Sequence, residues 1–253
     1  MASSPLSWIG SGSGRFSLIG YSLGGGISVA FASFFPDLVS SLVLIAPSGL
    51  IRTRHISARS RVIYSQNLIP ESILTAAVRR RLKTQLYPSK PSDDDEPRPD
   101  VTAPVASEMP KIESSPSVII SKSHPDITID KAVSWQVDHH DGFVQAFMSS
   151  IRHGPITNQH EYWRIVGRRL TERKSNSSRL GMHKNKVLII SGKNDGIIMR
   201  DEIIEDATDV LQGNVEFKFV DAGHEAPVAK AGEVVKIVSD FWELDQRDHQ
   251  SYP

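Results

Sequence analysis

Three side chains of the sequence have the types and the order needed for nucleophilic acyl transfer. Ser22 stands at the centre of a Gly-x-Ser-x-Gly pentapeptide, residues 20–24, and Asp195 and His224 follow much later in the chain. A serine hydroxyl becomes an effective nucleophile when a histidine takes its proton and a carboxylate holds that histidine in the correct tautomer. The residue types therefore predict a serine nucleophile, a histidine base and an orienting aspartate.

The setting of Ser22 is that of a turn between a strand and a helix. Residues 16–19 form a short strand-like run, and apolar side chains repeat at helical spacing over residues 25–35. Small neighbours permit a tight turn in which a nucleophile projects beside the helix N-terminus, where backbone N–H groups favour developing negative charge. The alternative interpretation is a glycine-rich turn that merely contains a serine.

Strands and helices alternate in the parts of the chain that carry the three residues. The runs 41–46 and 186–191 are short and mostly apolar, which is typical of buried parallel strands, and 215–220 alternates as a half-exposed strand does. Amphipathic helices are predicted over 203–211 and 234–242. The pattern predicts an α/β fold with a mainly parallel sheet.

Asp195 and His224 each come just after a predicted strand, and parallel strands place both on the sheet edge that carries Ser22. Taken singly, Asp195 is a turn residue before a glycine and His224 is a solvated loop residue. Asp201 is the better candidate for the cap of the next helix, which leaves Asp195 available to orient a histidine. The common edge and the order serine, aspartate, histidine favour the catalytic interpretation.

The composition excludes several other classes of function. The chain has 253 residues with 29 basic and 29 acidic side chains, and a net charge of zero disfavours nucleic-acid binding. No apolar run reaches the roughly 18 residues of a membrane span. The first residues lack a secretory-signal pattern, which favours a cytoplasmic protein, although the sequence does not fix the compartment.

Neither a metal nor a cofactor is expected. Cysteine is absent, so the chain has no thiolate ligand and no cysteine nucleophile. His139 and His140 are adjacent, and on a helix they would point about 100° apart rather than toward one metal. The glycines at 24–26 lack the lysine and hydroxyl residue of a phosphate-binding loop.

The chain resembles the α/β-hydrolase superfamily, in the branch that carries a helical cap after the strand that follows the nucleophile helix. The segments that carry this resemblance are Gly-Tyr-Ser-Leu-Gly-Gly at 20–25, Leu-Val-Leu-Ile-Ala-Pro at 42–47, Val-Leu-Ile-Ile-Ser-Gly-Lys-Asn-Asp at 187–195 and Gly-His at 223–224. The resemblance implies an α/β-hydrolase fold with a partial, mainly parallel sheet and an inserted helical cap.

The implied domain organisation has one core made from both ends of the chain. Residues 1–50 and 181–253 form the α/β core, and residues 51–180 form the cap. Within the cap, residues 88–116 are rich in proline and acidic side chains and contain no aromatic residue. Such a segment buries too little apolar surface to offset its ordering entropy, so we expect a disordered loop there.

The resemblance also implies a role for each site residue. Ser22 attacks an acyl carbonyl, His224 takes its proton and returns one to the leaving group, and Asp195 stabilises the imidazolium. The backbone N–H of Leu23 supplies one oxyanion-hole donor. A serine in place of a carboxylate nucleophile excludes the epoxide hydrolases and dehalogenases of this fold, and leaves ester, thioester, amide, lactone or carbon–carbon bond cleavage open.

The expected activity is that of an esterase-like serine hydrolase acting on a small or medium apolar acyl substrate. The apolar preference rests on aromatic residues in the predicted cap, namely Trp135, Phe143, Phe147 and Trp163. The sequence does not name the substrate or the oligomeric state.

The sequence departs from the family before the nucleophile strand. Only residues 1–15 precede that strand, whereas the family has several core strands there and a loop that supplies the second oxyanion donor. We therefore expect an N-terminally truncated core with an open sheet edge at 16–19, through which copies of the chain could associate. The alternative function is a catalytically impaired or non-catalytic remnant that acts as a binding module.

Overall fold

The computed structural model describes residues 15–55, 69–86, 118–175 and 182–243. The loop predicted to be disordered, at 88–116, lies outside these residues. In chain order the elements are β1 (Phe16–Tyr21), α1 (Leu23–Phe34), η1 (Pro36–Leu38), β2 (Val39–Ile45), η2 (Thr53–His55), α3 (Glu71–Leu86), β3 (Ile119–Ser121), β4 (His124–Thr128), α5 (Ile129–His139), α6 (Phe143–His153), α7 (His160–Ser175), η3 (His183–Asn185), β5 (Val187–Gly192), α8 (Arg200–Val210), β6 (Val215–Val220), α9 (Ala226–Ala229) and α10 (Ala231–Glu243).

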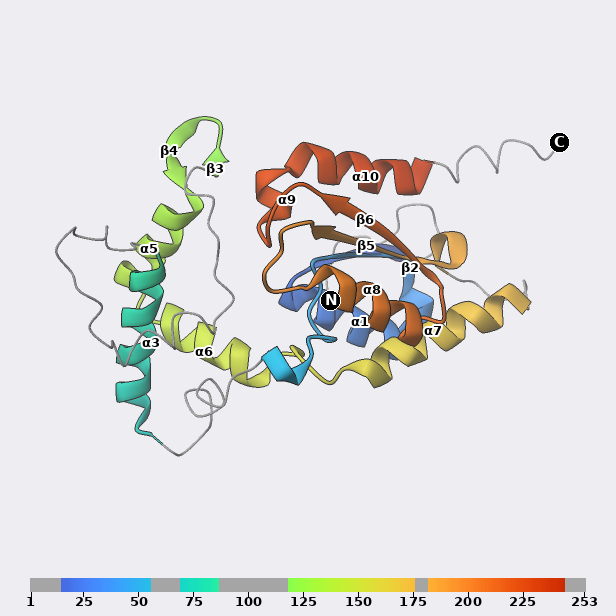
Figure 1. Ribbon diagram of the computed structural model, residues 1–253, viewed down its shortest axis with the longest axis horizontal. Helices are drawn as coiled ribbons and strands as arrows, with labels where there is room; N and C mark the ends of the chain where they lie inside the picture. Colours follow the sequence, from blue (N-terminus) through green and yellow to red (C-terminus); the bar gives the residue numbers. More distant parts are fainter. Residues whose placement is uncertain (1–14, 56–68, 87–117, 176–181, 244–253) are drawn as a thin grey trace. The chain divides into compact units, whose positions relative to one another are not determined.

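Four parallel strands form the main sheet, in the order β1-β2-β5-β6 (Figure 1). The predicted α/β fold with a parallel sheet is confirmed. Strand β5 is buried along its whole length, as its continuous apolar sequence predicts. The register pairs Tyr21 with Ile45 and Gly192 with Val220, so the carboxyl ends of the strands meet at one edge of the sheet.

Helices cover both faces of the sheet because the strand side chains alternate between them. Helices α1, α7 and α8 lie on one face and α10 lies on the other (Figure 1). Leu42 and Leu44 of β2 enter the core under α1, whereas Val43 and Ile45 enter the core under α10. This division fixes the sheet between two apolar layers and leaves its carboxyl edge to carry polar groups.

Strand β1 lies at one edge of the four-stranded sheet that the structure describes. Ile19 of β1 is 48% exposed, and Phe34 and Phe35 at the end of α1 are 65% and 50% exposed. Large exposed apolar surfaces of this kind are often contact surfaces or aggregation hazards. Self-association through this edge stays a prediction.

The described residues form two compact units, one drawn from residues 1–51 and 155–253 and the other from residues 52–154. The second unit contains helices α3, α5 and α6 and the antiparallel hairpin β3–β4. Its core contains Leu74, Val78, Leu82, Val137, Val144 and Met148. A two-pronged ion pair joins α6 to α3, with the Arg152 Nη atoms 2.8 and 3.1 Å from the Glu71 carboxylate oxygens.

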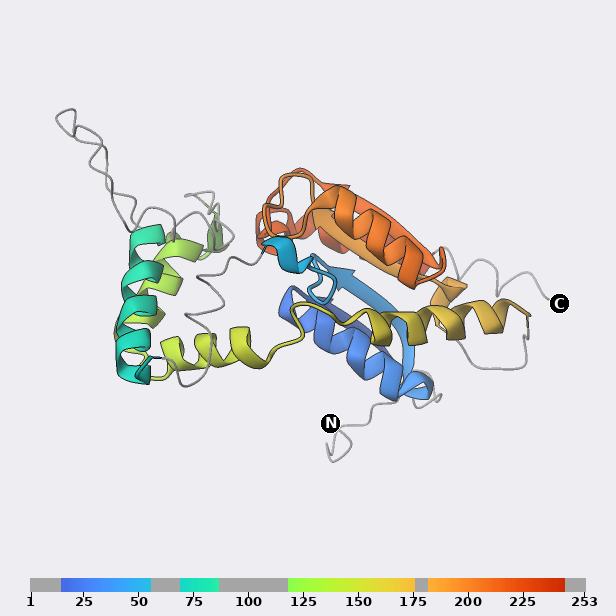
Figure 2. The ribbon, with the colours of Figure 1, turned by 60° about the horizontal axis from the view of Figure 1, so that its bottom comes forward.

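Helix α7 belongs to the first unit, although the sequence prediction placed residues up to 180 with the cap. Trp163, Val166 and Leu170 repeat at helical spacing, and all three are buried in the core that α1 shares. Figure 2 shows α7 running alongside α1. The boundary therefore falls at Gly154, because the apolar face of α7 is part of the core that also contains residues of α1.

Of the four aromatic residues used to predict an apolar substrate, three belong to or pack against an apolar core and one is exposed. Trp163 is fully buried in the core of the first unit. Phe143 and Phe147 pack against the core of the second unit. Trp135 is 60% exposed, and its ring stacks on that of His139 at 5.2 Å between centroids.

Among the described residues, no helix is both long and apolar enough to cross a membrane.

Candidate active site

Ser22 occupies a strained backbone position between β1 and α1. Its φ of 51° and ψ of −120° lie in a region that non-glycine residues rarely adopt, at a cost of about 1–3 kcal/mol. Three backbone hydrogen bonds of 2.9 Å hold it there: its N–H donates to the Ile45 carbonyl, and its carbonyl accepts from the N–H groups of Gly25 and Ser48. The strand-to-helix turn predicted from the pentapeptide is therefore present, and β2 and the segment after it fix its geometry.

The glycines of this turn are not equally constrained. A Cβ atom at Gly20 would overlap the Ser28 hydroxyl and the Gly24 carbonyl, and one at Gly25 would lie 2.6 Å from the Cβ of Pro47. At Gly24 a Cβ would meet no described atom within 4 Å outside its chain neighbours and the backbone of its own helix. Close packing thus requires glycine at Gly20, the first residue of the pentapeptide, and at Gly25, which follows the pentapeptide. Gly24, the last residue of the pentapeptide, has open space.

Of the three residues predicted from the sequence, His224 lies within hydrogen-bond distance of both of the others. Nε2 of His224 is 2.9 Å from Oγ of Ser22, and Nδ1 of His224 is 2.9 Å from Oδ2 of Asp195. An ionised carboxylate only accepts hydrogen bonds, so Nδ1 carries the proton and Nε2 accepts from the serine hydroxyl. The loop after β6 carries His224 to Ser22, which is 202 residues away in the chain, and to Asp195 on the loop after β5, which is 29 residues away.

Asp195 is held rigidly beneath the histidine. Its side chain has no exposed surface. Its Oδ1 accepts hydrogen bonds from the N–H groups of Ile197 and Ile198, at 2.8 and 2.9 Å. These two backbone donors satisfy one carboxylate oxygen and leave the other directed at the imidazole, so the histidine ring has a fixed acceptor. The arrangement provides a nucleophile, a base and an orienting acid in a continuous hydrogen-bonded chain.

Leu23 begins α1, and its backbone N–H has no acceptor among the described residues. An N–H group at the first turn of a helix is a donor that the helix itself does not satisfy. Such a group beside a nucleophile can donate to an oxygen that becomes negatively charged during acyl transfer. The position agrees with the oxyanion-hole role that the resemblance implies.

Tyr21 is a fourth polar group at this site, and the sequence reasoning missed it. Its hydroxyl donates to the backbone carbonyl of His224 at 3.0 Å, and its ring lies 5.4 Å from the imidazole between centroids. Tyr21 is 40% exposed, and partial burial raises its pKa to about 12, with smaller contributions from the charges of Asp195 and Glu225. The available signal was its position next to the nucleophile, which the pentapeptide pattern leaves unspecified.

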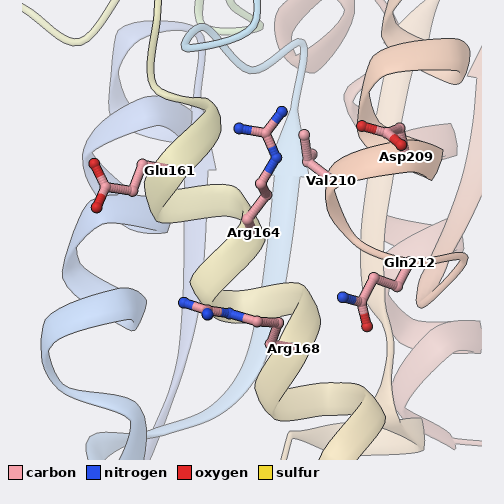
Figure 3. A pocket seen from close by; sticks show the side chains of 6 residues that line it. All are labelled: Glu161, Arg164, Arg168, Asp209, Val210 and Gln212. Atoms are coloured by element: carbon pink, nitrogen blue, oxygen red, sulfur yellow. The ribbon is translucent and has the colours of Figure 1, made fainter.

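A pocket elsewhere in the first unit does not involve these residues. It has a cavity volume of about 410 Å³ and is lined by Glu161, Arg164, Arg168, Asp209, Val210 and Gln212. Figure 3 shows that the two arginines extend from α7 in different directions rather than converging on one point. We therefore assign no ligand to it. Within the described parts of the chain, no group of three or more histidine, aspartate or glutamate side chains could hold a metal ion.

The parallel sheet, the helical layers and the turn at Ser22 define an α/β-hydrolase-type protein. The model of the alpha/beta hydrolase fold family matches residues 10–231, which is most of the chain. The chain belongs to the alpha/beta hydrolase fold family. No curated protein sequence matches it.

Solved structures of several hydrolases are similar to the chain. A carboxylesterase of the thaumarchaeon Nitrososphaera gargenis is 18% identical, with a TM-score of 0.51, over 93% of this chain and 67% of that one. The enol-lactonase of Burkholderia xenovorans LB400 is 14% identical, with a TM-score of 0.50, over 90% and 66%. A membrane phospholipase A is 16% identical, with a TM-score of 0.52, over 92% and 58%.

These identities are low, so the likeness shows the fold alone. The chain spans about two thirds of the length of the carboxylesterase and of the enol-lactonase. The family match supports a hydrolase, and the residues that act and the bond that is cleaved are matters for proposal.

Proposed function

We propose that this protein is a serine hydrolase that cleaves an acyl bond through Ser22, His224 and Asp195. The observation that carries the proposal is the continuous chain of two 2.9 Å hydrogen bonds from Asp195 through His224 to the Ser22 hydroxyl. A buried aspartate that contacts a histidine which in turn contacts a strained serine is the arrangement needed to activate a hydroxyl nucleophile. A role in fold stability alone would not require this alignment.

The proposed reaction has two half-reactions. Oγ of Ser22 attacks the acyl carbon while Nε2 of His224 takes the hydroxyl proton, and the imidazolium then gives that proton to the leaving group. In the second half-reaction, the water oxygen attacks the acyl carbon while His224 takes a proton from the water. The bond from the acyl carbon to Oγ then breaks, the imidazolium returns the proton to Oγ of Ser22, and the acid is released. Asp195 stabilises the imidazolium in both steps, and the Leu23 N–H donates to the oxyanion.

The substrate class is proposed only as an acyl compound. The preference for an apolar substrate was based on four aromatic side chains, of which three contribute to the cores of the two units and the fourth stacks on a histidine. Of the four, only Trp135 keeps a largely exposed side chain, at 60%, so the apolar preference rests on that residue alone. Esters, thioesters, lactones, amides and activated carbon–carbon bonds are all compatible with an acyl-serine mechanism.

We further propose that the second compact unit, residues 52–154, is the cap of this enzyme. It is inserted between the strand that follows the nucleophile helix and helix α7, so the core continues on both sides of it. It also has its own apolar core. Exchanging this unit for that of another capped hydrolase should change the order of preferred substrates and leave the labelling of Ser22 intact.

The proposal is tested by covalent labelling. A fluorophosphonate transfers its phosphonyl group to an activated serine. The O–P bond forms as the P–F bond breaks, the hydroxyl proton passes to the histidine base, fluoride leaves, and intact mass spectrometry detects the added mass. We expect one label per wild-type chain, no label on Ser22→Ala, and full labelling of Ser150→Ala, which removes a hydroxyl of α6 that donates to the Ala146 carbonyl. Absence of label on folded wild-type protein would favour the alternative function of a non-catalytic binding module.

A further inference from the structure

The residue before the nucleophile links the two halves of the active site. Tyr21 is the last residue of β1 and is covalently joined to Ser22. Its hydroxyl reaches the backbone carbonyl of His224 at 3.0 Å, across a sequence separation of 203 residues. The strand that carries the nucleophile is therefore hydrogen-bonded directly to the loop that carries the base.

The other backbone hydrogen bonds of the His224 loop lead elsewhere. The Gly223 N–H donates to the Glu225 carboxylate at 3.2 Å, within the loop itself. The Ala222 carbonyl accepts from the Asn194 N–H at 3.1 Å, which joins the loop to the end of β5 beside Asp195. Among the hydrogen bonds of the described residues, the one donated by the Tyr21 hydroxyl joins the backbone of His224 to β1, the strand before the nucleophile.

The tyrosine side chain is suited to a fixed contact of this kind. A tyrosine hydroxyl has an ordinary pKa near 10, so it is protonated and can donate throughout the neutral range, and partial burial raises the pKa of Tyr21 further, to about 12. Its ring lies against the imidazole at an interplanar angle of 34°, which restricts the ring of His224 from one side. The hydroxyl fixes the backbone of His224 and the aromatic ring limits its side chain.

We propose that Tyr21 is a positioning residue that holds His224 at the distance and orientation needed to take the Ser22 proton. This inference rests on the proposed serine-hydrolase function and adds a residue to it. Tyr21 acts through His224 and exchanges no proton with the substrate. Small displacements of a base from its nucleophile lower the rate of proton transfer without altering substrate binding, so the effect belongs in the chemical step.

The test compares two variants that each remove one tyrosine hydroxyl. Tyr21→Phe removes the donor and keeps the ring, and Tyr162→Phe makes the same chemical change on α7, where the ring packs against Phe34 at 5.4 Å. Fluorophosphonate labelling is followed over time at several reagent concentrations, which separates the maximal labelling rate, the half-saturating concentration and the final stoichiometry. Circular dichroism establishes that all three proteins are folded.

We expect Tyr21→Phe to reach full stoichiometry with a maximal labelling rate reduced about two- to tenfold, the range for loss of one neutral hydrogen bond. Its half-saturating concentration and all values for Tyr162→Phe should match the wild type. An unchanged rate for Tyr21→Phe would overturn the inference. So would a lower stoichiometry with an unchanged rate per labelled site, because that result describes a structural residue. Unlabelled wild-type protein would instead refute the proposed function itself.

Discussion

The contrast between Gly24 and Gly25 gives the sharpest test of the geometry around Ser22. A Cβ at Gly25 would lie 2.6 Å from the Cβ of Pro47 and 2.8 Å from its Cα. Carbon atoms in good contact are about 3.5–4.0 Å apart, so Gly25→Ala forces the helix and the segment after β2 to separate by roughly 1 Å. At Gly24 the added methyl group meets no described atom within 4 Å outside its chain neighbours and the backbone of its own helix.

The expected difference in stability follows from two opposing effects. Replacing a helical glycine by alanine stabilises a helix by about 0.5–1 kcal/mol, and this gain applies to both variants. Overpacking costs about 1–3 kcal/mol and applies to Gly25→Ala alone. The helix contribution cancels in the comparison, so Gly25→Ala should be less stable than Gly24→Ala by about 1–3 kcal/mol.

Urea unfolding of the two variants measures this difference directly. With a denaturant dependence of about 1–3 kcal/mol per molar urea, the midpoints should differ by roughly 1 M, and Gly24→Ala should equal or exceed the wild type. Fluorescence and circular dichroism should give the same midpoints, because a two-state comparison requires it. Equal midpoints for the two variants would show that the segment around Pro47 yields without cost and that the packing argument for Gly25 is wrong.

Three further predictions concern the triad and the second unit. Asp195→Asn should lower kcat/KM by about 10⁴-fold, because an amide group opposite Nδ1 favours the wrong histidine tautomer, and a decrease of less than tenfold in steady-state assays would contradict this role. Met148→Ala should destabilise the second unit by about 2–5 kcal/mol in urea unfolding, since its side chain is fully buried there, and an unchanged midpoint would argue against that core. The hydrogen bond from Arg152 lowers the pKa of Glu71, so the stabilisation by this ion pair should be present above the ordinary carboxyl pKa and be lost as pH falls through the lowered value. The unfolding midpoints of the wild type and Glu71→Gln should therefore converge in acid. A difference that stays constant with pH would refute the linkage.

Much of the core could be predicted from local sequence because buried parallel strands are short apolar runs. The run 215–220 is strand β6 as the structure has it, and 186–191 differs from β5 by one residue at each end. Pro36 marks the end of the nucleophile helix, since α1 ends at Phe34 and a short 3-10 helix follows. These features depend on contacts within a few residues, which the sequence displays directly.

Helix α7 could not be assigned to its unit from the sequence. Its apolar residues predict an amphipathic helix, but they do not indicate which part of the protein the apolar face packs against. The structure packs Trp163, Val166 and Leu170 into the core beside α1, in the unit that contains Ser22. The sequence also could not distinguish Gly24 from Gly25, because the constraint at Gly25 comes from Pro47, which lies on another segment.

The sequence by itself determined the fold class, because strand and helix periodicity are local properties. It also indicated that Ser22, Asp195 and His224 lie at one edge of the sheet, because each follows a predicted parallel strand. Only the tertiary structure decided the distances among Ser22, His224 and Asp195, since the loops that carry them meet only when the parallel strands come into register. It also decided the contact from Tyr21 to His224. A hydrogen bond between residues 203 positions apart leaves no pattern in either local sequence, because each partner is specified by the path of the whole sheet.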